Sequence, residues 1–269
     1  MKTRYGLHVI LFGLIALLAA VPASAGTLYF NQDDNTSDGF YTLNTSNGSA
    51  TLLGDGGVHY ITGGLSLGDS PGTLFGSKYS GIGRINKDGS GVTYIPDSTG
   101  AEGLEYVNGT LYGAMNGTFF TINTTTGLVA TNLAGLPGGA DVEGLAYGNG
   151  VIYGLSGWEG PSGNLYSYDI GLDTWSLVGS TGVGFVDTGL AFDGDLGILY
   201  AIGEQDNNLY RINPLTAEAT VIGPTGIIGE TGGGLAYDPS GTPVPEPSTL
   251  LLLGTGLGGL ALYRRRKKE

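Results

Sequence analysis

The chain has 269 residues, a formal net charge of −13, no cysteine and only two histidines. The lack of cysteine excludes disulfides, thiolate metal sites and cysteine nucleophiles. The acidic balance disfavours nucleic acid and anionic membrane surfaces as partners, because like charges repel one another.

Residues 1–25 have the pattern of a secretory signal peptide, predicted as an N-terminal signal helix. Two cations stand near the start, residues 9–20 are apolar, and Ala23 and Ala25 form a small-residue cleavage site. We therefore expect export through the Sec translocon and a mature chain that begins at Gly26. A retained anchor is the alternative, but an apolar run of about a dozen residues is short for one.

Residues 26–243 are predicted to form one exported domain. About 218 residues are enough for a single domain with a substantial core. Only four basic residues stand against 22 acidic ones in this region, which gives a net charge of −18. Such a surface favours solubility and attracts divalent cations.

A four-part pattern repeats through this domain. Apolar and polar residues alternate with β-branched and aromatic enrichment, which predicts strands, and Asn, Asp and Gly mark the turns between them. Each repeat opens with a Gly-Leu dipeptide, at Gly64, Gly103, Gly144, Gly189 and Gly234. After the first four dipeptides, second strands are predicted at 73–75, 110–112, 151–153 and 198–200, third strands at 82–86, 119–123, 165–169 and 209–213, and fourth strands at 91–95, 127–130, 174–178 and 219–222.

A four-stranded unit that recurs about every 40–45 residues predicts an all-β, five-bladed β-propeller. Residues 27–30, 40–44 and 50–53 match the second, third and fourth strands, whereas 234–237 match a first strand without followers. The two ends of the domain would therefore complete one blade together. An open β-solenoid or a pair of sandwiches is the alternative, but only a closed ring needs a split blade. The repeats also resemble those of bacterial surface propellers.

Carboxylates directly before the predicted inner strands are the candidate site of the domain. Glu102, Glu143 and Asp187 would lie near one mouth of the central channel, with Asp141 close by and Glu230 in the last blade. Converging carboxylates could bind Ca²⁺, which takes six to eight oxygen ligands, as in Ca²⁺-dependent propeller lactonases. The alternative, which we favour, is that these acids accept hydrogen bonds from backbone amides at the turns. No other cofactor is expected.

Other catalytic patterns are missing from the sequence. The histidines are His8, within the signal, and His59, in a predicted loop. No serine stands in a Gly-x-Ser-x-Gly elbow with a spare histidine to activate it, and no Gly-rich phosphate loop opens a helix. The sequence therefore predicts no catalytic residue.

The tail from 244 to 269 combines three segments in a fixed order. Its polar motif consists of Val244, Pro245, Glu246, Pro247, Ser248 and Thr249. Residues 249–263 carry no charge and are predicted to form a short transmembrane helix of about 22 Å, against roughly 30 Å of hydrocarbon. The membrane stop follows, with Arg264, Arg265, Arg266, Lys267 and Lys268.

This order closely resembles the PEP-CTERM sorting signal of Gram-negative bacteria. The resemblance implies recognition by an exosortase, which removes the tail and passes the protein from a transient inner-membrane anchor to the cell surface. An ordinary C-terminal anchor is the alternative. The sequence thus predicts an exported, non-catalytic surface or extracellular matrix protein associated with exopolysaccharide. The alternative function is a Ca²⁺-dependent, lactonase-like hydrolase using the channel carboxylates.

Overall fold

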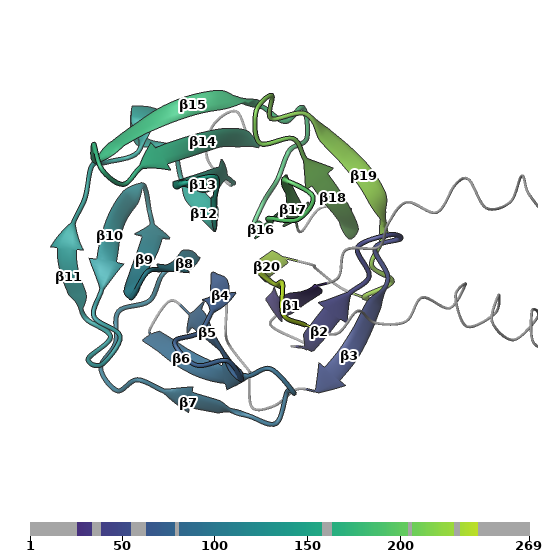
Figure 1. Cartoon of the computed structure of the whole chain (residues 1–269), viewed down its shortest axis with the longest axis horizontal. Helices are drawn as coiled ribbons and strands as arrows, with labels where there is room; N and C mark the ends of the chain where they lie inside the picture. Colours follow the sequence, from purple (N-terminus) through teal and green to yellow (C-terminus); the bar gives the residue numbers. More distant parts are fainter. Residues whose placement is uncertain are drawn as a thin grey trace, which may run out of the picture.

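The computed structural model describes residues 26–33, 39–54, 63–78, 81–157, 163–203, 206–228 and 232–241. In this part of the chain, five four-stranded antiparallel sheets stand around a central axis (Figure 1). The predicted signal helix and C-terminal transmembrane helix lie outside the described residues. The five-bladed β-propeller expected from the repeats is confirmed.

Each blade runs from an inner strand at the axis to an outer strand at the rim. Blade 1 contains β20 (Gly232–Asp238), β1 (Thr27–Asp33), β2 (Phe40–Leu43) and β3 (Ala50–Gly54); blade 2 contains β4 (Leu65–Leu67), β5 (Thr73–Lys78), β6 (Gly81–Asn86) and β7 (Val92–Tyr94); blade 3 contains β8 (Gly103–Val107), β9 (Thr110–Met115), β10 (Thr118–Ile122) and β11 (Val129–Asn132); blade 4 contains β12 (Val142–Gly148), β13 (Val151–Ser156), β14 (Asn164–Asp169) and β15 (Thr174–Ser180); blade 5 contains β16 (Gly189–Asp193), β17 (Ile198–Ile202), β18 (Asn208–Ile212) and β19 (Ala219–Pro224).

Blade 1 is assembled from both ends of the domain, as the sequence predicts. Strand β20 pairs with β1 from Thr27 opposite Asp238 to Asp33 opposite Gly232. Lys87, in the β6–β7 turn of blade 2, holds the end of β20 through a 2.7 Å ion pair between its Nζ and Asp238 Oδ2. The closing strand is therefore tied both to β1 in its own blade and to the neighbouring blade 2.

One predicted strand is displaced. The fourth strand of blade 3 was expected at 127–130, but β11 begins at Val129. Gly127 belongs to the preceding turn, where it has a φ of 69° and donates its backbone N–H to the Asn123 carbonyl at 2.7 Å. A turn that needs a left-handed residue therefore takes the glycine that the sequence pattern had assigned to the strand.

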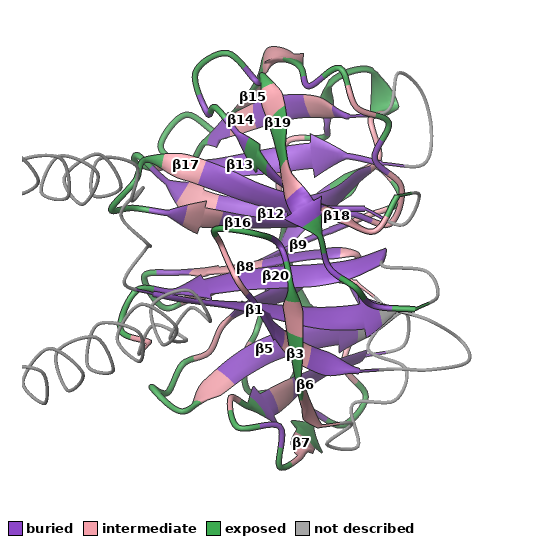
Figure 2. Ribbon diagram, turned by 90° about the vertical axis from the view of Figure 1, so that its right-hand side faces the viewer, coloured by how far each residue is buried: buried purple, intermediate pink, exposed green. Residues whose placement is uncertain are grey.

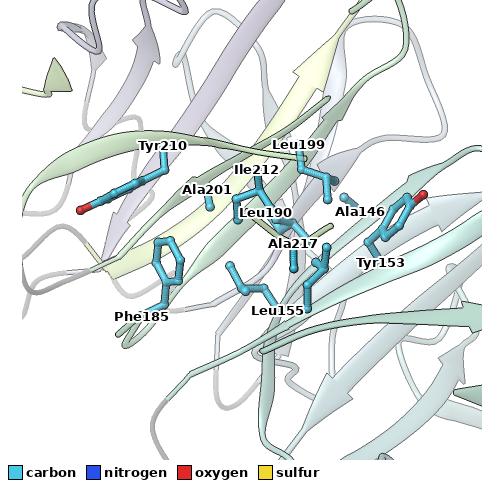
Figure 3. Close-up of a cluster of buried hydrophobic side chains, with 11 residues drawn as sticks. Ala146, Tyr153, Leu155, Phe185, Leu190, Leu199, Ala201, Tyr210, Ile212 and Ala217 are labelled. Atoms are coloured by element: carbon cyan, nitrogen blue, oxygen red, sulfur yellow. The ribbon is translucent and has the colours of Figure 1, made fainter. Parts of the chain in front are cut away.

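The hydrophobic core is divided into five clusters, one at each interface between neighbouring blades. The cluster between blades 4 and 5 includes Leu155, Leu190, Leu199 and Ile212, all fully or almost fully buried (Figure 3). Outer strands such as β3 and β15 are mostly exposed or half-buried, whereas the inner parts of the blades are buried (Figure 2). Stability thus comes from packing between blades, and every blade needs both neighbours.

The repeated glycine marks the place where neighbouring inner strands come closest. A Cβ on Gly64 would lie 2.1 Å from the Leu104 nitrogen, and one on Gly234 would lie 2.4 Å from the Leu65 nitrogen. The other three dipeptide glycines meet the next blade in the same way. The inner strands β4, β8, β12, β16 and β20 stand side by side around the axis (Figure 1). Because each dipeptide meets the dipeptide of the next blade, the amino ends of these strands share one mouth of the channel and their carboxyl ends the other.

Candidate functional site

The amino-terminal mouth of the channel carries the carboxylates singled out in the sequence. We call Glu102, Asp141, Glu143 and Asp187 the acidic mouth. Glu102 is half-buried and accepts a hydrogen bond from the Asn116 amide at 3.1 Å. Burial raises the pKa of Glu102, and the negative charges of Asp141 and Asp187 act in the same direction. At least these three groups are thus close enough to influence one another.

Glu143 and Asp187 are fixed by the backbone of neighbouring segments. Glu143 is 5% exposed and accepts a hydrogen bond at 3.1 Å from the amide of Thr188, directly before the inner strand of the next blade. It lies at a bulge within β12 rather than in front of the strand. The Asp187 carbonyl accepts the Gly233 amide at 2.9 Å. Glu102 and Glu143 both make the backbone contacts that the favoured alternative describes.

A calcium site on Glu102, Glu143 and Asp187 stays a prediction. Among the residues that the structure describes, no group of three or more His, Cys, Asp or Glu side chains is placed to hold a metal ion. Glu230 lies outside those residues.

The carboxyl-terminal mouth holds a pocket of about 280 Å³ to which all five inner strands contribute. The fourth residue of the Gly-Leu segment lines it in every blade, and four of these five residues are aromatic. They are Tyr106, Tyr147, Phe192 and Tyr237, with Leu67 in blade 2. We call this the aromatic pocket.

Glu105 is the one acidic side chain contributed to this pocket by an inner strand. Burial raises the pKa of Glu105 to about 8, against the lowering effect of hydrogen bonds from the Tyr147 amide and the Ser66 hydroxyl. The same Ser66 hydroxyl accepts the amide of Tyr106 at 2.7 Å. Glu105 is therefore mostly protonated at neutral pH, and its carboxyl can both donate and accept a hydrogen bond.

The sequence reasoning missed Glu105, although the sequence contains a signal for it. The third residue of the Gly-Leu segment is Ser66 in blade 2 and alanine in the other three blades, at Ala146, Ala191 and Ala236. Glu105 departs from this pattern. Comparing the repeats column by column would have identified it.

A second hollow of about 530 Å³ lies on the surface between blades 4 and 5. Arg211 and Glu218 both line it, together with Leu196, Leu215 and Asn149. Arg211 and Glu218 are exposed to solvent, so this surface lacks the buried polar groups that fix a ligand's orientation.

The residues predicted to direct export lie mostly outside the described part of the chain: Ala23, Ala25, Val244 to Thr249, and Arg264 to Lys268. Gly26 is described, and it is buried beside Tyr237, whose hydroxyl accepts the Gly26 amide at 3.1 Å. Among the described residues, no helix is long and apolar enough to cross a membrane. Residues 1–25 and 242–269 lie outside the described residues.

Comparison with known families identifies the tail. Residues 243–267 match the model of the PEP-CTERM protein-sorting motif. The chain carries a PEP-CTERM sorting signal. This motif implies an exported protein that an exosortase sorts to the cell surface, and the signal follows the closing strand β20, which ends at Asp238, by only a few residues.

The propeller has structural but not sequence relatives among the comparisons. A chain in a crystal structure of a nidogen/laminin complex aligns with a TM-score of 0.50 and 15% identity, covering 81% of this chain and 86% of that one. At this identity the likeness concerns the fold alone. No curated protein matches the chain.

Proposed function

We propose that this protein is a non-catalytic component of the cell surface or extracellular matrix, associated with exopolysaccharide and anchored only transiently in the inner membrane. The sorting motif at 243–267 carries the proposal. The net charge of −18 between residues 26 and 243 supports it, because a strongly acidic domain stays soluble outside the cell. The backbone contacts of Glu102 and Glu143 further favour a structural role for the acidic mouth.

Replacing Pro245, Glu246 and Pro247 by alanine tests the sorting step. We expect the altered protein to remain in the inner-membrane fraction, because the exosortase no longer recognises the tail that holds it there. Fractionation followed by mass spectrometry of the C-terminal peptide measures both location and cleavage. Leu215→Ala, a change of an exposed side chain in the propeller, serves as control and should be released like the unaltered protein. Equal release of the triple variant would refute the sorting step.

The matrix association has its own readout. The released protein should sediment with exopolysaccharide isolated from the same cells, and digestion of the polysaccharide should return it to the soluble fraction. Release without sedimentation would leave the sorting step intact and refute the association.

A further inference from the structure

We propose that the aromatic pocket binds one neutral sugar ring, with the apolar face of the ring against the aromatic side chains and its hydroxyl groups on Glu105. This inference deepens the proposed association with exopolysaccharide and rests on it for the source of the sugar. It assigns recognition of the sugar to the carboxyl-terminal mouth of the channel.

The walls of the pocket are held in place before any ligand arrives. Tyr106, Tyr147 and Phe192 are partly exposed, so part of each ring faces the pocket. The other sides of these walls pack against the core: Tyr106 lies 5.4 Å from Phe75, Phe192 lies 6.1 Å from Tyr153, and Tyr237 lies 6.1 Å from Tyr200, between ring centroids. Because these rings are already fixed, a ligand loses little affinity to ordering them.

Glu105 supplies the polar contact that such a pocket needs. Its backbone position is set by β8, and its carboxyl is held between Ser66 of blade 2 and the Tyr147 amide of blade 4. A protonated carboxyl donates through its O–H and accepts through its carbonyl oxygen. A sugar hydroxyl also donates and accepts, so the two groups are complementary.

The charge of the lining favours a neutral ligand. No Lys or Arg lines this pocket in the described chain, so the carboxylate of an acidic sugar would find no counter-ion there. Asp195 is exposed at the rim and adds one negative charge. A cation would be attracted to the rings and to Asp195, but it would also favour ionisation of Glu105, which burial opposes.

The size of the pocket suits a single ring. Small-molecule pockets span about 300–1,000 Å³, and this one, at about 280 Å³, lies just below that range. All five blades contribute to it, so it exists only in the closed ring. A terminal sugar, or one projecting from a polysaccharide, can therefore enter while the rest of the polymer stays outside.

The test is a titration of the exported protein, purified after release, with the methyl glycosides of glucose, galactose, mannose and N-acetylglucosamine. Changes in its protein NMR signals report binding. We expect at least one glycoside to bind saturably with a Kd on the order of 1 mM, as befits a ligand of this size.

Two substitutions of Glu105 separate the polar contact from folding. Glu105→Ala introduces the residue that three other blades have at this position, so the variant should fold. It loses the polar contact and should bind the glycoside about tenfold more weakly. Glu105→Gln keeps a donor and an acceptor and should stay within about threefold of the unaltered protein. Arg211→Ala, in the separate hollow between blades 4 and 5, should bind normally.

The inference is overturned if no glycoside binds, or if Glu105→Ala binds as well as the unaltered protein. It is also overturned if tetramethylammonium binds instead and Glu105→Gln abolishes that binding, since an ionised Glu105 would then recognise a cation. Matrix association without glycoside binding would refute this pocket alone. Glycoside binding by a protein that does not associate with the matrix would refute the proposed function and leave the pocket standing.

Discussion

Glu105 shows how one residue can acquire special properties within a repeated framework. Alanine at the same position of blades 4, 5 and 1 has no group to titrate, and Ser66 in blade 2 is neutral. Glu105 alone brings an acid to this level of the channel, where burial raises its pKa to about 8. The sequence around Glu105 is like that of the other inner strands, so the rise in its pKa comes from the groups that surround it in the folded protein.

This pKa predicts a specific dependence of stability on pH. The folded protein keeps the Glu105 proton up to about pH 8, whereas the unfolded chain loses it near the ordinary value of 4.5. The folded state therefore binds more protons in between, so its free energy of unfolding falls as pH rises through this window. Thermal unfolding followed by circular dichroism should show the Tm falling more between pH 5 and pH 8 in the unaltered protein than in Glu105→Gln.

Each kcal/mol by which the free energy of unfolding falls over this pH range should lower the Tm by about 2–4 °C. Glu218→Gln, which removes an exposed carboxyl, should follow the unaltered protein. Parallel pH curves for Glu105→Gln and the unaltered protein would show that Glu105 is not buried as an acid.

The Gly-Leu dipeptide is explained at the level of the inner strands. Leucine enters the cores between blades, as Leu104, Leu145 and Leu190 do. The glycine before it allows the backbone of the next blade to approach, which a side chain would prevent. The dipeptide therefore sets both the packing of each blade and the spacing of the ring.

Gly189→Ala tests this explanation. A Cβ there would lie 2.4 Å from the Gly233 oxygen and 2.6 Å from the Leu235 nitrogen, and neither backbone atom can turn aside as a side chain could. We expect the free energy of unfolding to decrease by about 1–3 kcal/mol, as in other overpacked sites, measured by chemical denaturation. Gly135→Ala, whose Cβ would have no atom within 4 Å, is the matched control and should change it by less than about 0.5 kcal/mol. Equal effects would argue against a tight inner ring.

At the scale of the whole molecule, closure is what makes the propeller one cooperative unit. Strand β20 pairs with β1 and contacts the inner strands β4 and β16 on either side. Without it, blade 1 would lose its inner strand, and β1 would become an exposed edge open to pairing with other chains.

Two truncations test the closure and the predicted domain boundary. A chain of residues 26–243 keeps all twenty described strands and should unfold in one cooperative transition. A chain of residues 26–231 lacks β20 and should aggregate or unfold without a sharp transition. Circular dichroism and size-exclusion chromatography distinguish these outcomes. A shorter chain as stable as the longer one would mean that the ring does not depend on its closing strand.

The sequence by itself determined the number of blades, nearly all of the strand positions, the split blade and the sorting tail. These features are local patterns repeated along the chain, and period, turn residues and charge order can be read without knowing any contact. Even the error at Gly127 was local, since a turn and a strand competed for the same glycine.

Only the tertiary structure decided the environment of each acid. Glu102, Glu105 and Glu143 sit in similar sequence contexts, beside or within a Gly-Leu segment. Burial and neighbouring acids raise the pKa of Glu102. Glu105 is protonated in the aromatic pocket, and Glu143 is held by the Thr188 amide of the next blade. The physical reason is that burial, hydrogen bonding and pocket shape depend on groups from other strands and from neighbouring blades, which meet only when the ring closes.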